Sequence, residues 1–185
     1  MRLFVALEIP VAVRNTISTL ISDFRELAPE VRWARPESLH VTLRFIGEVE
    51  PEKVGAIRVA LGGATFREQV ALGFRGIHFF LSKRFLVLWV GLEDSAELQS
   101  LASHVDRKLI AVGIPREERV YTPHVTLARS NNPEIITKLR PVIDQNSQRN
   151  FGSFQATQFH LIESKLKASG AEYTTLQSFV FAAEA

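Results

Sequence analysis

The tetrapeptide His40-Val41-Thr42-Leu43 returns later in the chain as His124-Val125-Thr126-Leu127. We interpret each copy as a β-strand. Side chains of a strand alternate between its two faces, so His and Thr of one copy point to one side and Val and Leu to the other. Two imidazoles and two hydroxyls on matching strands therefore predict one composite site.

The composition is that of a single folded domain. A chain of 185 residues, 46% of them apolar, is long enough for one well-buried core, and we expect one domain spanning residues 1–185. The 22 Lys and Arg against 20 Asp and Glu leave a net charge of +2, which neither requires nor excludes a nucleic-acid partner. Cys is absent, so a thiol nucleophile, a disulfide framework and a thiolate metal site are excluded.

The apolar runs are short. The opening residues 1–8 are too short for a signal peptide, and the longest run, residues 85–92, is far below membrane-spanning length. We therefore expect a soluble cytoplasmic protein with no membrane partner and no obligate protein partner.

Apolar periodicity and breaker residues predict the elements. Helices are expected after Pro10, after Pro51, from an Asp94–Glu97 capping box to Gly113, and from Asn132 to Arg140, where Pro141 should end the helix. Strands are expected at residues 3–7, 39–46, 70–80, 85–90, 124–129, 154–162 and 173–181.

Each half of the chain then has the order strand, long helix, motif strand, shorter helix, strand. This order predicts an α+β fold of two duplicated lobes, with antiparallel sheets flanked by helices. A pseudo-twofold axis would set the motif strands side by side, with the site in the cleft between the lobes.

The paired motif suits phosphoester chemistry. For water to displace an oxygen from phosphorus in line, one group takes a proton from water while another gives a proton to the leaving oxygen. Two His serve both roles near neutral pH, because an unperturbed imidazole has a pKa of about 6.5. The hydroxyls of Thr42 and Thr126 can donate to the phosphate oxygens and stabilise the transition state. Since the chain has no His-Glu-x-x-His motif and no dense Asp cluster, we expect no metal and no cofactor.

At these residues the chain resembles the two-histidine (2H) phosphoesterase superfamily. Within it the chain is similar to the RNA 2′,3′-cyclic phosphodiesterases, also known as bacterial 2′-5′ RNA ligases. The resemblance covers most of the length, through residues 2–6, Trp33, residues 39–47, residues 121–129, and the ending Ser164, Leu166, Gly170 and Tyr173.

The resemblance implies a bilobed fold and roles for the motif residues. His40 would be the proton donor to the leaving oxygen and His124 the proton acceptor from water, with Thr42, Thr126 and Arg129 binding substrate. The substrates would be RNA ends or cyclic nucleotides. The implied activity opens RNA 2′,3′-cyclic phosphates to 2′-phosphates without a metal, and some members join RNA ends through 2′-5′ bonds without ATP.

Residues near the motifs carry weaker predictions. Strict alternation points Arg129 away from His124, so a strand end or bend must turn it toward the site. Alternation places Arg44 on the face of His40, as a phosphate contact or a solvated charge. His78 shares a face with buried-type residues, which predicts a core histidine, and His104 and His160 receive no role.

The loops carry charges and one tyrosine without a single interpretation. Tyr121 either stacks on a base or packs beneath its loop. The basic loop residues either follow an RNA backbone or are solvated charges; they are Lys83, Arg84, Arg116 and Arg119.

Two other functions stay open. A non-catalytic RNA-end or nucleotide-binding module would keep the Thr pair and the basic loops without needing both imidazoles. A metal-dependent hydrolase could gather its ligands from distant residues. The physiological substrate, the relevance of ligation and the oligomeric state are left open by the sequence.

Overall fold

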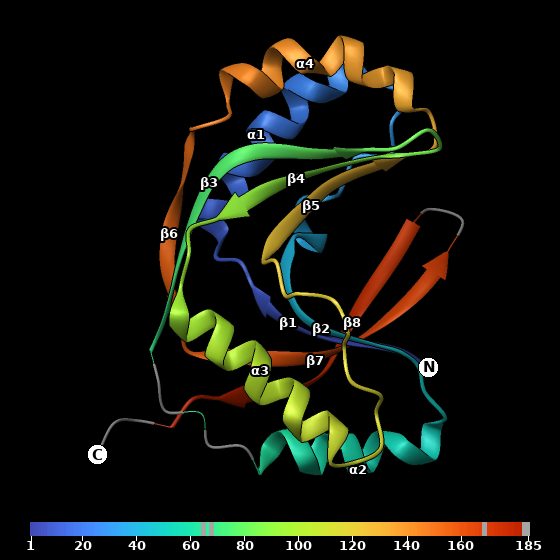
Figure 1. The fold of residues 1–185 in the computed structure, drawn as a ribbon, viewed down its shortest axis with the longest axis vertical. Helices are drawn as coiled ribbons and strands as arrows, with labels where there is room; N and C mark the ends of the chain where they lie inside the picture. The colour runs from blue at the N-terminus through green and yellow to red at the C-terminus, as the bar shows by residue number, and fades with distance from the viewer. Residues whose placement is uncertain (64–65, 67–68, 168–169, 183–185) are drawn as a thin grey trace.

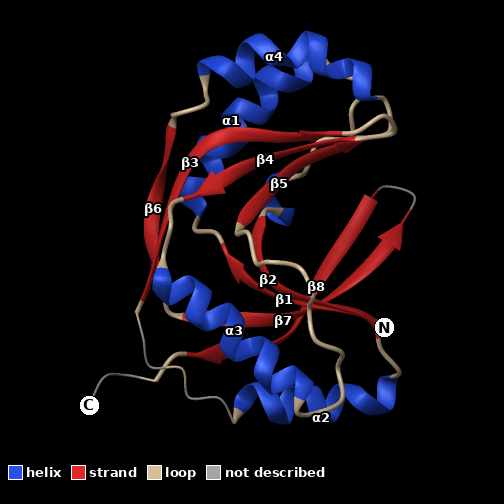
Figure 2. Cartoon of the chain, viewed as in Figure 1, coloured by secondary structure: helices blue, strands red, loops and turns tan. Residues whose placement is uncertain are grey.

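Two antiparallel sheets form the centre of the molecule, and helices lie at its two ends (Figures 1 and 2). The computed structural model describes residues 1–63, 66, 69–167 and 170–182. Sheet A has the strand order β2-β1-β7-β8 and sheet B the order β5-β4-β3-β6. Within the described residues the strands are β1 (Arg2–Glu8), β2 (His40–Glu48), β3 (Val70–Leu81), β4 (Leu86–Leu92), β5 (His124–Ser130), β6 (Asn150–Ala156), β7 (Gln158–Lys167) and β8 (Gly170–Val180). The α-helices are α1 (Val11–Leu27), α2 (Pro51–Gly62), α3 (Ala96–Ile110) and α4 (Ile136–Gln145).

The two halves of the chain exchange elements. Helix α1 follows β1 of sheet A, yet it packs with α4 on sheet B, beside β6. Helix α3 follows β4 of sheet B, yet it packs with α2 and beside β2 of sheet A, while it also contacts β3 of sheet B. In the same way β3 is the last element of the first half of the chain, yet it belongs to sheet B. The predicted two-lobed α+β fold is confirmed, but the expectation that each half builds its own lobe is wrong.

A continuous core joins the lobes. The apolar stripe of α1 and the stripe of α3 belong to a single cluster of buried residues, together with the helix-facing side chains of both sheets. Because neither half can bury its helix against its own strands, each lobe needs both halves of the chain.

Three local predictions are wrong. Ser95, and not Asp94, caps α3: its hydroxyl accepts a hydrogen bond of 3.1 Å from the Leu98 backbone N–H. Pro141 lies inside α4 and does not end it, because the buried Leu139 and Ile143 hold the helix against the core and offset the one lost backbone bond. The strand expected at residues 154–162 is two strands in different sheets, β6 and β7.

Both motif strands contain a β-bulge immediately after the Thr. In sheet A, Thr42 pairs with Ala6 and Arg44 with Val5, so Leu43 is the extra residue. In sheet B, Thr126 pairs with Trp89 and Ala128 with Leu88, so Leu127 is the extra residue. A bulge places two residues opposite one and reverses the alternation of faces beyond it.

Beyond each bulge the side chains change sides. Phe45 and Arg129 come to lie on the face of the motif His and Thr, whereas Arg44 and Ala128 turn toward the core and are buried. Strand β3 has a similar shift between Arg75 and Ile77, which turns His78 outward. The prediction that His78 is a core residue is therefore wrong.

Candidate active site

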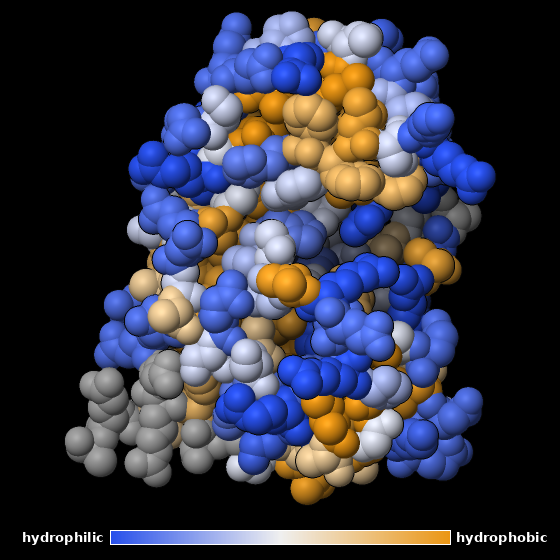
Figure 3. Space-filling model, viewed as in Figure 1, coloured by the Kyte–Doolittle hydropathy of each residue, from blue (hydrophilic) through white to orange (hydrophobic). Residues whose placement is uncertain are grey.

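A cleft of about 630 Å³ lies between the two sheets and brings the predicted site residues together. The space-filling view shows the surface hollowed between the two ends of the molecule, with hydrophilic side chains along the rim (Figure 3). Motif residues from both strands line the cleft: His40, Thr42, His124, Thr126 and Arg129. They are joined by the aromatic residues Phe4, Phe45 and Tyr173 and by the cationic residues Arg2, Arg32 and Arg35.

The two imidazoles are held in the same way. The Nδ1 atom of His40 lies 2.7 Å from the Ser38 carbonyl oxygen, and that of His124 lies 2.8 Å from the Thr122 carbonyl oxygen. A carbonyl oxygen only accepts, so Nδ1 carries the hydrogen in both rings. Nε2 of each ring is therefore the atom left to exchange protons with a substrate.

The surroundings of the two rings differ. His40 lies between Phe4 and Tyr173, with ring centroids 4.8 and 5.2 Å away. Burial lowers the pKa of His40, the Ser38 carbonyl partly opposes this by raising it, and the nearby charge of His124 lowers it further. His124 instead contacts the Trp89 ring at a centroid distance of 5.9 Å.

Each bulge is tied to the segment that leads to the other motif. The Leu127 carbonyl accepts a hydrogen bond of 2.7 Å from the Ala34 N–H, which lies six residues before His40. In β2 the Arg44 guanidinium donates to the Pro115 carbonyl, which precedes His124 in the chain. These bonds hold the two motif strands in a fixed relation.

Arg44 does not lie in the cleft. Its guanidinium is buried, donates to Asp106 of α3 at 2.7 Å and approaches Glu117 at 3.3 Å. Both interpretations of this residue, as a phosphate contact and as a solvated charge, are therefore wrong. The bulge at Leu43 is the reason, because it turns Arg44 to the helix side of sheet A.

Arg129 does lie in the cleft, because the bulge at Leu127 supplies the bend that the prediction required. Phe45 occupies the matching position in β2 and was not predicted as a site residue. Each follows its motif Thr by three residues, and that spacing points to the site only once the bulge is known.

The remaining weak predictions concern Tyr121, His160 and the basic loop residues. Tyr121 packs against the core beneath its loop, and burial raises the pKa of its hydroxyl. His160 is buried and lies 2.9 Å from the Ser178 hydroxyl. The basic loop residues are exposed, namely Lys83, Arg84, Arg116 and Arg119.

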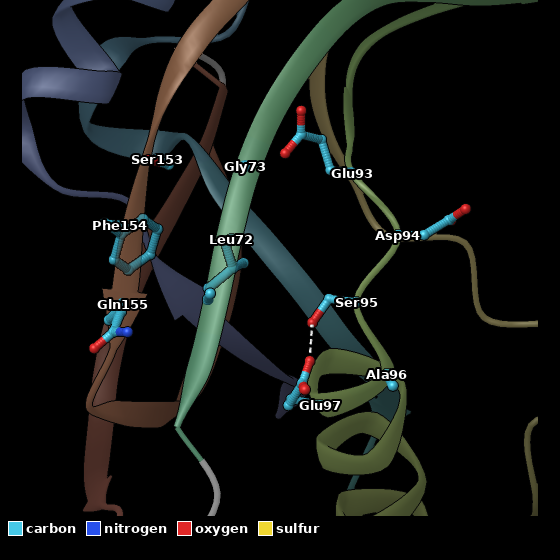
Figure 4. A pocket seen from close by; sticks show the side chains of 11 residues that line it. Leu72, Gly73, Glu93, Asp94, Ser95, Ala96, Glu97, Ser153, Phe154 and Gln155 are labelled. Carbon is cyan, nitrogen blue, oxygen red and sulfur yellow. Dashed lines mark hydrogen bonds between the residues drawn. The ribbon is translucent and has the colours of Figure 1, made fainter.

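A second hollow, of about 510 Å³, lies on sheet B where β4 leads into α3 (Figure 4). It is acidic, since Glu93, Asp94 and Glu97 line it and Glu97 accepts a hydrogen bond of 3.0 Å from Ser95. Carboxylates at this density repel a phosphate, whereas the cleft between the sheets offers imidazoles, hydroxyls and Arg side chains. The cleft is therefore the candidate active site.

This fold and this pair of histidines define a two-histidine phosphoesterase. The chain belongs to the 2′-5′ RNA ligase superfamily, whose sequence profile matches residues 10–168. The predicted family resemblance and the prediction of an enzyme of this family are confirmed.

Two relatives carry the same name and match nearly the whole chain. An RNA 2′,3′-cyclic phosphodiesterase of Archaeoglobus fulgidus is 31% identical, covering 97% of this chain and 99% of its own. Another, from Thermus thermophilus, is 30% identical over 97% of this chain and 89% of its own. The crystal structure of E. coli LigT complexed with 3′-AMP matches with a TM-score of 0.76 at 25% identity, covering 97% of both chains.

Two features are absent from the described residues. No helix among them combines the length and apolar character needed to cross a membrane. No group of three or more His, Asp and Glu side chains in this part of the chain is arranged to hold a metal ion. The expected cytoplasmic location and metal-free mechanism stay predictions.

Proposed function

We propose that this protein hydrolyses RNA 2′,3′-cyclic phosphate ends to 2′-phosphomonoesters, with His40 and His124 as the acid and base. The observation that carries the proposal is the matched pair of rings, each with Nδ1 bound to a carbonyl and Nε2 left for the cleft. The names of its relatives and the 3′-AMP in the LigT structure support the substrate class.

The proposed reaction proceeds in line at phosphorus. Water attacks the phosphorus and gives its proton to Nε2 of His124, while the bond from phosphorus to the ribose 3′-oxygen breaks and that oxygen takes a proton from Nε2 of His40. The product is a 2′-phosphate with a free 3′-hydroxyl. Proton exchange with solvent then returns both imidazoles to their starting states.

The other predicted residues act on the phosphate. The hydroxyls of Thr42 and Thr126 donate to its non-bridging oxygens from opposite sheets, and Arg129 balances its charge. These groups are in place before the reaction, so they stabilise the growing negative charge without reorganising. A 5′-hydroxyl in place of water would leave a 2′-5′ bond without ATP, because the strained cyclic phosphate supplies the driving force.

The test is to incubate the purified protein with EDTA and an RNA ending in a 2′,3′-cyclic phosphate, and to identify the phosphomonoester formed. A 2′-phosphate made in EDTA is the expected product. Activity that EDTA abolishes and a divalent metal restores would establish the metal-dependent hydrolase instead. Binding without turnover would establish the non-catalytic RNA-binding module. Adding an RNA with a 5′-hydroxyl end to the same reaction tests ligation, which would appear as a longer product with a 2′-5′ bond.

A further inference from the structure

A row of rings crosses the open face of sheet B, starting at the candidate active site. Thr126 of β5 pairs with Trp89 of β4, which pairs with His78 of β3. Residues directly opposite each other in adjacent strands point to the same face of a sheet. Trp89 and His78 therefore extend the face of Thr126 by one and two strands, or about 5 and 10 Å.

The rings of this row are in contact. The centroid of the Trp89 ring lies 5.9 Å from that of the His124 ring. On its other side the Trp89 ring stacks on the His78 ring, with a centroid distance of 6.2 Å and an interplanar angle of 26°. Phe80 lies two residues beyond His78 on the same face, is 52% exposed, and contacts Phe85 at 5.7 Å. Hydrophobic side chains gather over the β3–β4 hairpin on the face that Figure 3 shows.

The corresponding row in sheet A is buried. There Thr42 pairs with Ala6, which pairs with His160, and His160 is only 3% exposed. A methyl group thus stands where sheet B has an indole, and a buried histidine stands where sheet B has an exposed one. The exposed His78 and the half-buried Trp89 of sheet B are therefore not required by the fold that the two lobes share.

We propose that His78, Phe80 and Trp89 form a stacking platform for the nucleobases that precede the terminal phosphate of a single-stranded RNA. The platform is continuous with the candidate active site through the contact between Trp89 and His124. This inference rests on the proposed function and deepens it, because it selects RNA ends over free cyclic nucleotides as the preferred substrate.

Charge and ring chemistry favour this occupant. Arg129 pairs with Val87, which pairs with Phe80, and the exposed Lys83 and Arg84 lie in the turn of the same β3–β4 hairpin. Cations are therefore gathered beside the Phe80 end of the platform, where they can bind the phosphates between the bases. Exposed aromatic rings on a β-sheet stack on any base, which suits an enzyme that reads an end and not a sequence.

The experiment compares two substrates with the same terminal nucleotide, a mononucleoside 2′,3′-cyclic phosphate and a short single-stranded RNA ending in that cyclic phosphate. Wild-type protein should have the higher kcat/KM on the RNA. The variant His78→Ala/Phe80→Ala should lose about tenfold in kcat/KM on the RNA, mainly through KM, because the bases lose two of the rings on which they stack. Its kcat/KM on the mononucleotide should stay within twofold of wild type. His78→Phe keeps a ring and should keep the preference for RNA.

Val59→Ala is the matched control, because Val59 is a 77% exposed apolar side chain on α2 and should change neither substrate. Equal losses on both substrates, or an unchanged ratio between them, would overturn the platform while leaving the proposed function standing. If the wild-type protein hydrolysed neither substrate, the proposed function would fail. The platform would then be judged by fluorescence anisotropy of the labelled RNA, where equal affinity of wild type and His78→Ala/Phe80→Ala would overturn it.

Discussion

His40 and His124 hold their Nδ1 atoms alike, but only His40 is enclosed by two aromatic rings. Burial disfavours the imidazolium ion, which is why the pKa of His40 lies below its ordinary value. An acid with a lowered pKa releases its proton readily, which suits a group that must protonate a poor leaving group. In the complex the anionic phosphate then restores part of the lost affinity for that proton.

Removing the Tyr173 ring should raise the pKa of His40. In Tyr173→Ala, water reaches the imidazole, and the desolvation that lowers the pKa is relieved. Tyr173→Phe keeps the ring and should leave the pKa low. The measurement is an NMR titration of the His40 ring protons in the free protein. An unchanged pKa of His40 in Tyr173→Ala would show that Phe4 and the other buried neighbours cause the shift.

A substrate with an activated leaving group should separate the two histidines. His40→Ala should lose most activity on a cyclic phosphate, yet regain a large part of it on an ester with an acidic phenol, which departs without a proton. His124→Ala should stay impaired on both, because water must be deprotonated whatever departs. Steady-state kinetics of both variants on both substrates decide the roles. Rescue of His124→Ala alone would reverse them.

The Thr hydroxyls should matter to the chemical step. Thr42→Ala or Thr126→Ala removes a donor to the phosphate without touching proton transfer, and should reduce kcat/KM roughly ten- to a thousandfold. Thr→Ser at the same position keeps the hydroxyl and should recover most of the rate. An alanine variant with the wild-type rate would show that its hydroxyl does not contact the phosphate.

At the scale of elements, the bulges decide which side chains reach the cleft. The repeated His-x-Thr could be predicted as a site because the first three residues of each copy keep strict alternation. Arg44 was misplaced and Phe45 missed because an extra residue, Leu43, reverses the faces, and a Leu in a bulge has the same apolar character as a Leu in a regular strand. His78 was misplaced for the same reason, by the irregularity between Arg75 and Ile77.

The ion pair between β2 and α3 should be a structural requirement. Arg44→Met leaves Asp106 without its partner in a mostly buried setting, and should lower the free energy of unfolding by about 3 kcal/mol. Adding Asp106→Leu removes the unpaired carboxylate and should recover part of that loss. Guanidinium unfolding curves measure both. A loss below about 0.5 kcal/mol would place the pair among ordinary surface salt bridges.

At the scale of the whole molecule, the exchange of helices between the lobes was beyond sequence reasoning. Periodicity shows which side of α1 is apolar, with Ile17 and Phe24 on the buried stripe, but two sheets offer similar apolar faces. Which of the two sheets α1 covers depends on the direction in which the chain leaves β1. Because periodicity does not show which sheet a helix covers, the two-lobed fold could be predicted but the helices that belong to each lobe could not.

The exchange predicts that the two lobes unfold together. Leu101 is a fully buried residue of α3, the helix that packs with α2 and beside β2 of sheet A. Trp89 lies in sheet B, and Trp33 bridges to Ala128 of the same sheet. Leu101→Ala should cost about 2–5 kcal/mol and shift the midpoint seen by tryptophan fluorescence as much as the midpoint seen by far-UV circular dichroism. Coincident shifts are the mark of one cooperative domain over residues 1–185. A fluorescence midpoint that stays in place while the circular dichroism midpoint falls would mean that the lobes are separate folding units, despite the core that they share.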